Sequence, residues 1–404
     1  MKINLLAILL FSLLLTACSI KSPHKDEDKN ATTEHNITHI SAAHPREESS
    51  INITDITTAT TTANRQTIVD SGLENSVVPT QSYQELTGDF LGNQKLTYFI
   101  DRMHNEHGFS YEYLYKLFSE AKNTNYEEMP CVSTSDSSEN CTVTIKPKGK
   151  WDRYRDMFVY ERNINRGIAF WQEHEQALNR AYATYGVLPQ YIVGIIGIET
   201  AYGVNFGKKR VIDVLTTKGM TGDRREDFYT GQLEKFLIMT RDSHLDAATL
   251  MGSNAGAMGY GQFIASSYLD FAVDFNDDGV TDLWNAEDAI GSVANYFARN
   301  GWNRNISQVA VRAKYKGNRF RRLKTGYKTK YSQYKLRKKY KITPRTKLRY
   351  RGPVSLIKLP KYSYDELWLG THNFRVITTY NHSTFYGMAV YQLGEAVKKR
   401  RYGN

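Results

Sequence analysis

The stretch Tyr191-Ile-Val-Gly-Ile-Ile-Gly-Ile-Glu199-Thr-Ala-Tyr-Gly203 decides how this sequence is interpreted. Read as a helix, it places three isoleucines on the same face as Glu199, namely Ile192, Ile195 and Ile196. A carboxyl group on an apolar stripe is costly to ionise, so we expect a raised pKa for Glu199. A proton retained near neutral pH is what a general acid needs. The alternative is an exposed glutamate at a frayed helix end.

Helical patterns surround this stretch on both sides. The apolar spacing predicts a helix over 90–103, ended by Gly108, and a second helix over 111–121. Strand-like runs come late in the chain, so we expect a mainly α fold of the α+β class with more than one lobe. The other expected helices span 167–185, 228–241, 266–273, 286–299 and 383–399, and the expected strands span 308–315, 354–359 and 374–380.

The N-terminus has the features of an export signal. A basic start precedes an apolar run at 5–15, which is shorter than the roughly 20 residues that span a bilayer. The run ends in Leu15-Thr-Ala-Cys18, which resembles a bacterial lipoprotein signal in which residues 1–17 are removed and Cys18 carries lipid. Ser19 in place of an aspartate resembles sorting to the outer membrane, so we expect the chain at its periplasmic face. The alternative is an ordinary cleaved signal with an incidental cysteine.

Two further expectations follow from export. Residues 18–85 are polar and without periodicity, which predicts a disordered tether between the lipid and the folded part. Cys131 and Cys141 flank a polar loop, and an even pair of cysteines in an exported protein predicts a disulfide. Closing that loop could stabilise the fold by about 3 kcal/mol at most in the chain-entropy model.

Positive charge is concentrated in one segment. Residues 304–351 contain 19 Lys and Arg and no Asp or Glu, and the formal net charge of +11 leaves −8 for the rest of the chain. In a cytoplasmic protein this would indicate nucleic-acid binding. In the periplasm the available polyanions are wall peptides and lipopolysaccharide phosphates, so nucleic acid is not an expected partner. A merely solvated basic surface is the alternative.

A glycine-rich run lies at 251–263. Its small residues let the backbone approach a ligand closely. Ser253 and Gln262 can hydrogen-bond sugar amides and hydroxyls, whereas Tyr260 and Phe263 could stack on a ligand or pack in the core. The run lacks the spacing and the lysine of a phosphate-binding loop.

The segment 274–285 has the spacing of a calcium loop. Gly279 falls at the sixth position, where such a loop turns sharply. The twelfth position is Asn285, which offers a neutral oxygen in place of the usual bidentate acid and could instead cap the helix that begins at Ala286. The expected ligands of a structural Ca²⁺ are Asp274, Asn276, Asp278, Val280 (through its carbonyl), Asp282 and Asn285.

Together these motifs resemble the membrane-bound lytic murein transglycosylase B family. The resemblance rests on Glu199 within Gly-Ile-Ile-Gly-Ile-Glu-Thr, on the runs 256–263, 274–285 and 288–297, and on Tyr380-Asn-His-Ser-Thr, and it extends from about residue 90 to the C-terminus. It implies a lysozyme-like helical core between a helical N-terminal lobe and a small mixed α/β lobe. It also implies cleavage of the MurNAc-GlcNAc β-1,4 bond of peptidoglycan with 1,6-anhydro-MurNAc ends, and no cofactor for catalysis.

The resemblance also implies roles for individual residues. Glu199 matches the single catalytic acid/base, and the implied partner is the peptidoglycan glycan strand. We expect a monomer, and other cell-wall enzymes remain open as partners. This sequence departs from the family at Asn285, in the insert with Cys131 and Cys141, and in the basic segment. The residues that match the glycan subsites are Tyr154, Arg224, Arg225, Ser253, Gln262, Phe263, Tyr296, Tyr380, Asn381 and Tyr386.

Two other functions stay open. A muramidase that hydrolyses the same glycan needs a second carboxylate, and a wall-binding lipoprotein without catalysis would bind through the basic segment. The candidates for the second acid are Asp213, Asp223, Glu226 and Asp227. The expected domains are a signal peptide (1–17), the lipidated cysteine with its tether (18–85), a helical lobe (86–150), a lysozyme-like core (151–302), a basic mixed lobe (303–380) and a C-terminal helix that packs back on the helical lobe and core (381–404).

Overall fold

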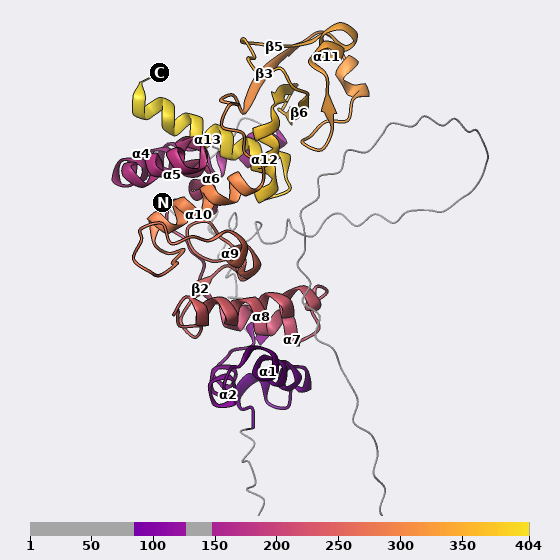
Figure 1. Ribbon diagram of the computed structural model, residues 1–404. Coiled ribbons are helices and arrows are strands. Elements are labelled where there is room, and N and C mark those ends of the chain that lie inside the picture. The colour runs from indigo at the N-terminus through magenta and orange to yellow at the C-terminus, as the bar shows by residue number, and fades with distance from the viewer. Residues whose placement is uncertain (1–84, 127–147, 404) are drawn as a thin grey trace, which may run out of the picture. The chain divides into compact units, whose positions relative to one another are not determined.

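The computed structural model describes residues 85–126 and 148–403. The expected signal peptide, the lipidated Cys18, most of the expected tether and the pair Cys131 and Cys141 lie outside these residues. The described part is mainly helical with a small antiparallel sheet (Figure 1), which confirms the expected fold class.

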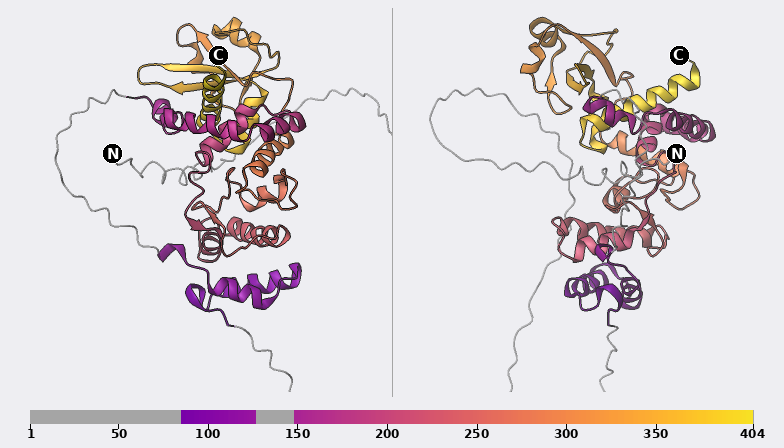
Figure 2. Two further views of the ribbon diagram at one scale, coloured as in Figure 1. Left: turned by 90° about the vertical axis from the view of Figure 1, so that its left-hand side faces the viewer. Right: turned by 180° about the vertical axis from the view of Figure 1, so that it is seen from behind.

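Helix α6 (Pro189–Glu199) lies at the centre of the core. Pro189 occupies its first turn, where a missing N–H costs nothing, and every residue from 190 to 198 is buried. The helix is therefore apolar all round rather than along one stripe. The helices packed on it are α4 (Glu161–Glu173), α5 (Glu175–Tyr185), α10 (Ala286–Arg299) and α13 (Thr384–Tyr402), which Figures 1 and 2 show grouped together.

Two glycines let α6 and α13 approach each other closely. A Cβ added at Gly194 would lie 2.6 Å from the Val390 carbonyl oxygen, and one added at Gly394 would lie 2.1 Å from the Gln190 carbonyl oxygen. Any side chain at either position would meet the backbone of the other helix. The contact places the C-terminal end of α6 beside the N-terminal part of α13. Helix α13 also contacts α4, α12 (His372–Tyr380) and α3 (Lys150–Asp156).

The prediction of one helix over 167–185 is wrong. The chain forms two helices that meet at His174, whose φ of −110° and ψ of 29° lie outside the helical region. Both α4 and α5 contact α6, but α5 also packs on α10 and α4 on α13. A straight helix could not bury its apolar stripe against all of these partners, so the bend follows from tertiary packing.

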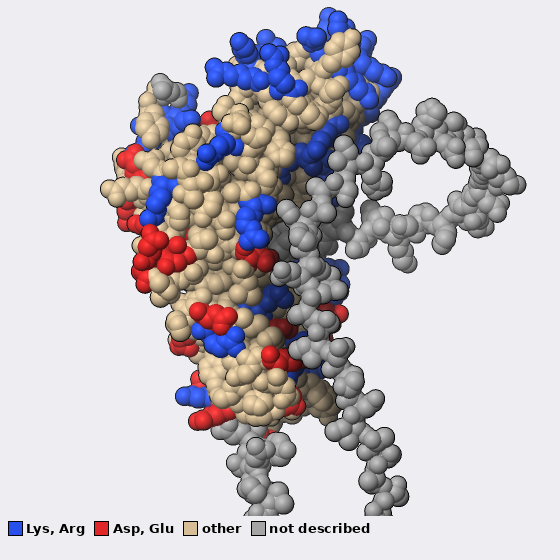
Figure 3. Space-filling model, in the orientation of Figure 1, with Lys and Arg blue, Asp and Glu red and all other residues tan. Residues whose placement is uncertain are grey.

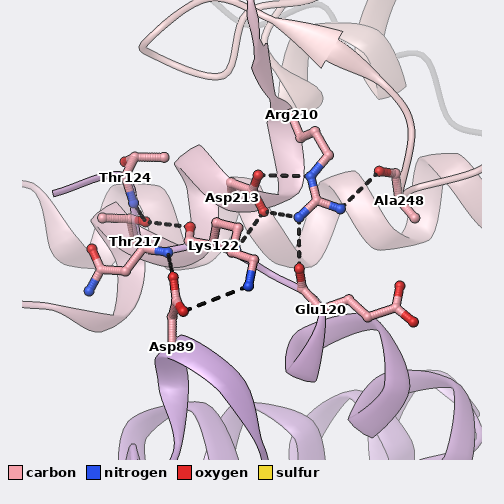
Figure 4. A network of polar contacts seen from close by, with 9 residues as sticks. Asp89, Glu120, Lys122, Thr124, Arg210, Asp213, Thr217 and Ala248 are labelled. Atoms are coloured by element: carbon pink, nitrogen blue, oxygen red, sulfur yellow. Dashed lines mark hydrogen bonds and ion pairs between the residues drawn. The ribbon is translucent and has the colours of Figure 1, made fainter. Parts of the chain in front are cut away.

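The N-terminal helices are attached to the core by a polar network. Helix α1 (Gln94–His107) ends at Gly108 in the left-handed region, as predicted, and α2 (Tyr111–Ser119) follows. The centre of the network is Asp213 of α7 (Val211–Met220). Its carboxylate accepts two hydrogen bonds of 2.8 Å from the Arg210 guanidinium and one of 2.8 Å from the Lys122 backbone N–H (Figure 4). The same guanidinium donates to the Glu120 carbonyl at 2.8 Å.

A five-stranded antiparallel sheet forms the late, basic part of the chain. Its strand order is β4-β6-β7-β3-β5, and it has its own small core with Phe320, Leu336, Val354 and Leu367 among its buried side chains. The strands predicted over 308–315 and 354–359 are confirmed. The strands are β3 (Ala310–Tyr315), β4 (Lys330–Tyr331), β5 (Ile342–Pro344), β6 (Val354–Pro360) and β7 (Asp365–Gly370), and α11 (Gln333–Tyr340) lies between β4 and β5 in the chain.

The strand predicted over 374–380 is wrong, because this segment is the helix α12. Its run of β-branched residues favours a strand locally. However, Phe374 and Ile377 are spaced by one helical turn and both are fully buried, and α12 packs against α13. Burial of that face therefore overrides the local preference.

The remaining helices, strands and turns complete the described part of the chain. They are α8 (Glu226–Asp242), α9 (Ala265–Phe271), the two-stranded sheet of β1 (Lys209–Arg210) and β2 (Met251–Gly252), and the 3-10 turns η2 (Gly88–Phe90), η3 (Thr124–Tyr126) and η4 (Arg319–Arg322). In the described part of the chain no single helix is long and apolar enough to cross a membrane, and α5 with α6 pass that test only as a pair bent by 118°. The described residues belong to one compact unit, and the lobe boundaries expected near 150, 302 and 380 stay predictions.

Candidate active site

Glu199 is the last residue of α6. It is partly exposed, but its carboxyl group lies among buried side chains, and this burial raises its pKa to about 7 from an ordinary value of 4.5. The C-terminal end of a helix carries partial negative charge, which also disfavours an ionised carboxylate. The predicted rise is confirmed, and Glu199 is not an exposed side chain at a frayed end. Glu199 can therefore hold a proton near neutral pH and still reach a ligand.

Tyrosines surround the Glu199 carboxyl group. The Tyr386 hydroxyl donates a hydrogen bond to Glu199 Oε1 at 2.5 Å, which opposes the rise in the pKa of Glu199. The ring of Tyr380 stacks on that of Tyr386, with centroids 6.5 Å apart and planes 9° apart. Burial first, and then the charge of Glu199, raises the pKa of Tyr154, Tyr380 and Tyr386 above the ordinary range. All three phenols therefore stay neutral and can act as hydrogen-bond donors.

The chain turns sharply directly after Glu199. Ala201 and Tyr202 have φ of 50° and 63°, in the left-handed region that side chains rarely adopt. The Thr200 hydroxyl lies within hydrogen-bond distance of the Ile196 carbonyl at 3.1 Å and accepts from the Gly203 N–H at 3.1 Å. This turn fixes the end of α6 and thereby the direction of the Glu199 side chain.

Tyr202 holds the same turn from inside the core. A Cβ added at Gly167 or at Gly197 would lie 2.4 Å from its hydroxyl, so the ring fits only because α4 and α6 both carry glycine there. The sequence prediction did not single out Tyr202. The signal for Tyr202 is this pair of glycines. They come together around its hydroxyl only in the folded protein, so no local sequence pattern could reveal it.

The glycine-rich run 251–263 is a tight loop beside Glu199. Gly259 has φ of 66°, and a Cβ there would lie 2.3 Å from the Leu283 carbonyl oxygen. The Gln262 amide donates to the carbonyl oxygens of Phe206 and Gly259 at 3.2 and 3.0 Å. The Tyr380 hydroxyl donates to the Gly261 carbonyl at 2.6 Å. These bonds join the loop to α12 and to the turn after Glu199.

Aromatic residues from three elements form one wall of the site. Phe263 is buried, and its ring centroid lies 6.0 Å from that of Tyr296 and 5.9 Å from that of Tyr380. Tyr296 on α10 donates to the Thr379 carbonyl at 2.8 Å. The structure thus brings together most of the predicted aromatic site residues around Glu199.

Other predicted residues have local roles or lie apart. The Ser253 hydroxyl accepts from the Ala255 and Ala257 N–H groups at 3.3 and 3.1 Å. Asn381 is partly exposed and follows α12, while Ser383 caps α13. The Arg225 guanidinium lies 4.0 Å from the Phe228 ring centroid, and Arg224 is exposed. The structure brings neither arginine into contact with Glu199.

The candidates for a second catalytic acid are engaged elsewhere. Asp213 is bound by Arg210 and Lys122 as described above, Asp223 accepts from the Arg225 N–H at 2.8 Å, and Glu226 pairs with Lys95 at 2.5 Å. Asp227 is exposed on α8. None of these four carboxylates contributes to the raised pKa of Glu199, which burial produces with only Tyr386 opposing. Glu199 is thus the single acid of the described site.

The segment 274–285 folds as a tight loop with Gly279 at φ of 88°. Asp274 accepts from the Asp278 and Gly279 N–H groups at 3.3 and 2.8 Å. Asn285 accepts from the Glu287 N–H at 2.8 Å and so caps α10, which was one of its two expected roles. Within the described residues, no three His, Cys, Asp or Glu side chains are gathered closely enough to hold a metal ion.

The sequence matches a known family over most of its length. Residues 92–395 match the model of the family described as "Transglycosylase SLT domain". The chain belongs to this transglycosylase family. It is 43% identical over 327 residues to the membrane-bound lytic murein transglycosylase B of Escherichia coli K12, which covers 80% of this chain and 88% of the relative. The resemblance stated from the motifs is therefore confirmed.

Solved transglycosylase structures agree with the fold. The Escherichia coli lytic transglycosylase SLT35 in complex with bulgecin A has a TM-score of 0.70 and 43% identity, and it covers 80% of this chain and 99% of its own. The same enzyme in complex with calcium has a TM-score of 0.71 with the same identity and coverage. The described part of this chain thus has the lysozyme-like fold that the motifs imply.

Proposed function

We propose that the chain is a peptidoglycan lytic transglycosylase that cleaves the MurNAc-GlcNAc β-1,4 bond and leaves a 1,6-anhydro-MurNAc end. The observation that carries the proposal is a single carboxyl group, Glu199, whose pKa of about 7 lets it hold a proton at neutral pH. Membership of the transglycosylase family supports the same reaction. Among residues 85–126 and 148–403 no carboxylate acts on Glu199, so in the proposed reaction the substrate supplies the nucleophile itself.

The reaction needs two proton transfers through Glu199. Protonated Glu199 donates to the glycosidic oxygen as the bond from C1 of MurNAc to that oxygen breaks, and the GlcNAc leaves with a free hydroxyl group. The N-acetyl carbonyl of MurNAc stabilises the positive charge at C1. The Glu199 carboxylate then takes the proton of the C6 hydroxyl, whose oxygen bonds to C1 and closes the anhydro ring. Glu199 ends protonated, and no water is consumed.

The neighbouring tyrosines prepare Glu199 for both steps. Tyr386 donates to Glu199 Oε1 in either protonation state, so it fixes the carboxyl group while the other oxygen faces the ligand. Its bond is stronger to the carboxylate that forms after the first step. Phe263, Tyr296 and Tyr380 pack together beside Glu199, and this aromatic cluster would limit the access of water to the cation. We assign the other subsite residues predicted from the motifs to glycan binding.

The products distinguish this reaction from hydrolysis. Purified sacculi digested with the protein are expected to release muropeptides that are each one water lighter than those from a muramidase, as measured by mass spectrometry. Products with a reducing MurNAc end would show that the chain is a hydrolase. Sacculi that are bound but not degraded would support the third possibility, a wall-binding lipoprotein without catalysis.

We also propose a structural Ca²⁺ in the loop 274–285. The oxygen groups of Asp274, Asn276, Asp278, Asp282 and the Val280 carbonyl have the chemistry that Ca²⁺ prefers. Two observations support the loop as a site: Gly279 makes its sharp turn, and a solved relative is in complex with calcium. Because the described Asp side chains are not gathered closely enough to hold a metal, the ion would have to draw them together and replace the hydrogen bonds that Asp274 accepts from the loop backbone. Asn285 is the weakest of the proposed ligands because its side chain caps α10.

Calcium is expected to raise the melting temperature of the protein by linkage. Asp278→Asn removes a charged ligand and should abolish the Ca²⁺-dependent rise. Asp277→Asn is the matched control, because Asp277 stands at a non-ligand position of the loop and its φ of 62° is one that asparagine tolerates. Asn285→Asp restores an acid at the twelfth position, retains a capping side chain and should tighten binding. Melting curves that do not respond to Ca²⁺ or to a chelator would refute the site.

We further propose that lipid on Cys18 anchors the protein at the periplasmic face of the outer membrane, and that Cys131 and Cys141 form a disulfide. The sequence features given above support both assignments, and the relative from Escherichia coli is named as membrane-bound. The expected monomeric state and any partner among cell-wall enzymes are part of the same proposal.

A further inference from the structure

The basic segment 304–351 forms an exposed surface and contains no Asp or Glu of its own. Of its 19 Lys and Arg residues, all but Arg312 are exposed. Among the described residues, the one ion pair made by this segment joins Arg312 to Glu366 at 2.6 Å. Figure 3 shows blue side chains gathered over the part that Figure 1 labels β3, β5 and α11. The other 18 charges are therefore exposed, and no carboxylate of residues 85–126 or 148–403 is paired with them.

Helix α11 (Gln333–Tyr340) is rich in exposed positive charge. Its single buried residue is Leu336, which anchors it to the core of the sheet. Four of its exposed residues are Lys335, Arg337, Lys338 and Lys339, and it carries no acid that could form a stabilising pair along the helix. Like charges at this spacing repel and destabilise a helix. A surface that keeps such repulsion is the kind that binds a polyanion.

The basic surface is continuous with the candidate active site. The Tyr327 hydroxyl donates to the His382 carbonyl at 3.2 Å, and the two rings stack with planes 11° apart. The Lys328 ammonium lies 5.9 Å from the Tyr327 ring centroid. His382 stands between Asn381 and Ser383, the cap of α13, and it follows Tyr380 by two residues. The basic segment thus contacts the turn that joins Tyr380 of α12 to the helix that carries Tyr386.

We propose that this basic surface binds the carboxylate-bearing peptide stems of the peptidoglycan strand that extends from the active site. The proposal rests on the proposed function, because it takes the glycan at Glu199 as given. Each stem that is not cross-linked carries more carboxylates than amines, and stems recur along the strand. A row of flexible exposed cations suits such a repeated anion better than a single built pocket would.

The same surface is poorly suited to a lipid bilayer. A helix that lies in a membrane interface inserts large apolar residues opposite its charged face. On α11 the one aliphatic side chain, Leu336, is buried in the lobe, and the exposed aromatic residue is Tyr334. Its exposed positions therefore offer charge and a phenol, which can contact a peptide or a sugar, but no apolar face for acyl chains.

The test compares two variants of the full chain that each lose four positive charges, at different places. Both carry Glu199→Gln, so that bound sacculi are not digested. One adds Lys335→Gln, Arg337→Gln, Lys338→Gln and Lys339→Gln on α11. The control adds Lys116→Gln, Arg162→Gln, Lys398→Gln and Lys399→Gln, which are exposed and lie outside the basic segment. Binding to sacculi is measured by cosedimentation over a series of salt concentrations, and folding is checked by thermal melting.

The α11 variant is expected to bind sacculi at least tenfold more weakly than the control at low salt. The difference should shrink as salt rises, because exposed charges are screened over about 8 Å at physiological ionic strength. Sacculi whose carboxylates are amidated should bind the Glu199→Gln parent as weakly as native sacculi bind the α11 variant. Should the α11 variant unfold, Lys324→Gln, Lys328→Gln and Lys330→Gln on the side of Tyr327 are compared with a control that carries Lys116→Gln, Lys398→Gln and Lys399→Gln.

Three outcomes would overturn the proposal. These are equal binding by the α11 variant and the control, undiminished binding to amidated sacculi, and tighter binding to vesicles of phosphatidylglycerol than to sacculi. Turnover of a short glycan without peptides, measured in the Glu199 wild-type background, separates this proposal from the proposed function. If the short glycan gives no anhydro ends but the α11 variant still loses sacculus binding, the proposed reaction is wrong. The proposal that the basic surface binds peptide stems would still be supported.

Discussion

Glu199→Gln is expected to lower turnover of peptidoglycan by at least the roughly 10²- to 10⁴-fold typical of a lost acid or base. Glutamine keeps the shape and can still accept the hydrogen bond from Tyr386, but it has no proton to donate. Turnover is measured as the release of anhydro-muropeptides, and binding of the glycan is measured separately. Binding should be retained, because the substitution removes a transition-state interaction. A variant with near-native turnover would refute the assignment of Glu199.

The same substitution is expected to stabilise the fold at neutral and alkaline pH. In the folded protein the pKa of Glu199 is raised to about 7 from 4.5. The unfolded chain therefore loses its proton first, so the free energy of unfolding decreases as pH rises from about 4.5 to about 7. Glutamine does not titrate. Denaturant unfolding should show the variant to be more stable than wild type above pH 7 and similar to it below the ordinary pKa.

Gly394→Ala is expected to impair both stability and turnover. The new Cβ would lie 2.1 Å from the Gln190 carbonyl oxygen, so α6 and α13 must move apart. Overpacking of this kind costs about 1–3 kcal/mol in the free energy of unfolding. The two helices carry Glu199 and Tyr386, and a displacement of about 1 Å at an active site can reduce turnover by about 10²-fold.

Gly231→Ala is the matched control for that substitution. Gly231 lies inside α8, and a Cβ there would meet nothing within 4 Å. Replacing an unhindered helical glycine by alanine stabilises by up to about 1 kcal/mol. Urea unfolding and turnover of both variants would check the pair of expectations. Equal changes in stability and turnover at the two positions would show that the close approach of α6 and α13 does not maintain the geometry of the site.

The sequence was most informative where a local pattern and burial agree. The helix predicted over 286–299 has the bounds of α10, and the pKa of Glu199 rises because the apolar helix around it is buried, as its isoleucines indicated. Glu199 could be proposed as the catalytic acid in this way because its environment is encoded by its own neighbours in the chain. The glycine-rich run and Asn285 as a helix cap were recognisable for the same reason.

The sequence was least informative where distant segments meet. Helix α12 has the composition of a strand and is helical because α13 covers Phe374 and Ile377. The role of Tyr202 depends on glycines of two other helix segments. Tyr386 was expected among the glycan subsites, and its bond to Glu199 spans 187 residues of chain. No local pattern contains these contacts, so only the folded structure provides them.

Glu199 and Tyr386 are far apart in the chain, so their contact forms only when α13 docks on α6. This matters for an enzyme that degrades peptidoglycan, because activity before folding is complete could damage the cell wall. If α13 undocks, Tyr386 leaves, water reaches the end of α6, and the pKa of Glu199 returns towards 4.5. The carboxyl group is then ionised at neutral pH and has no proton to give. We therefore expect a molecule whose α13 is undocked to have no lytic activity.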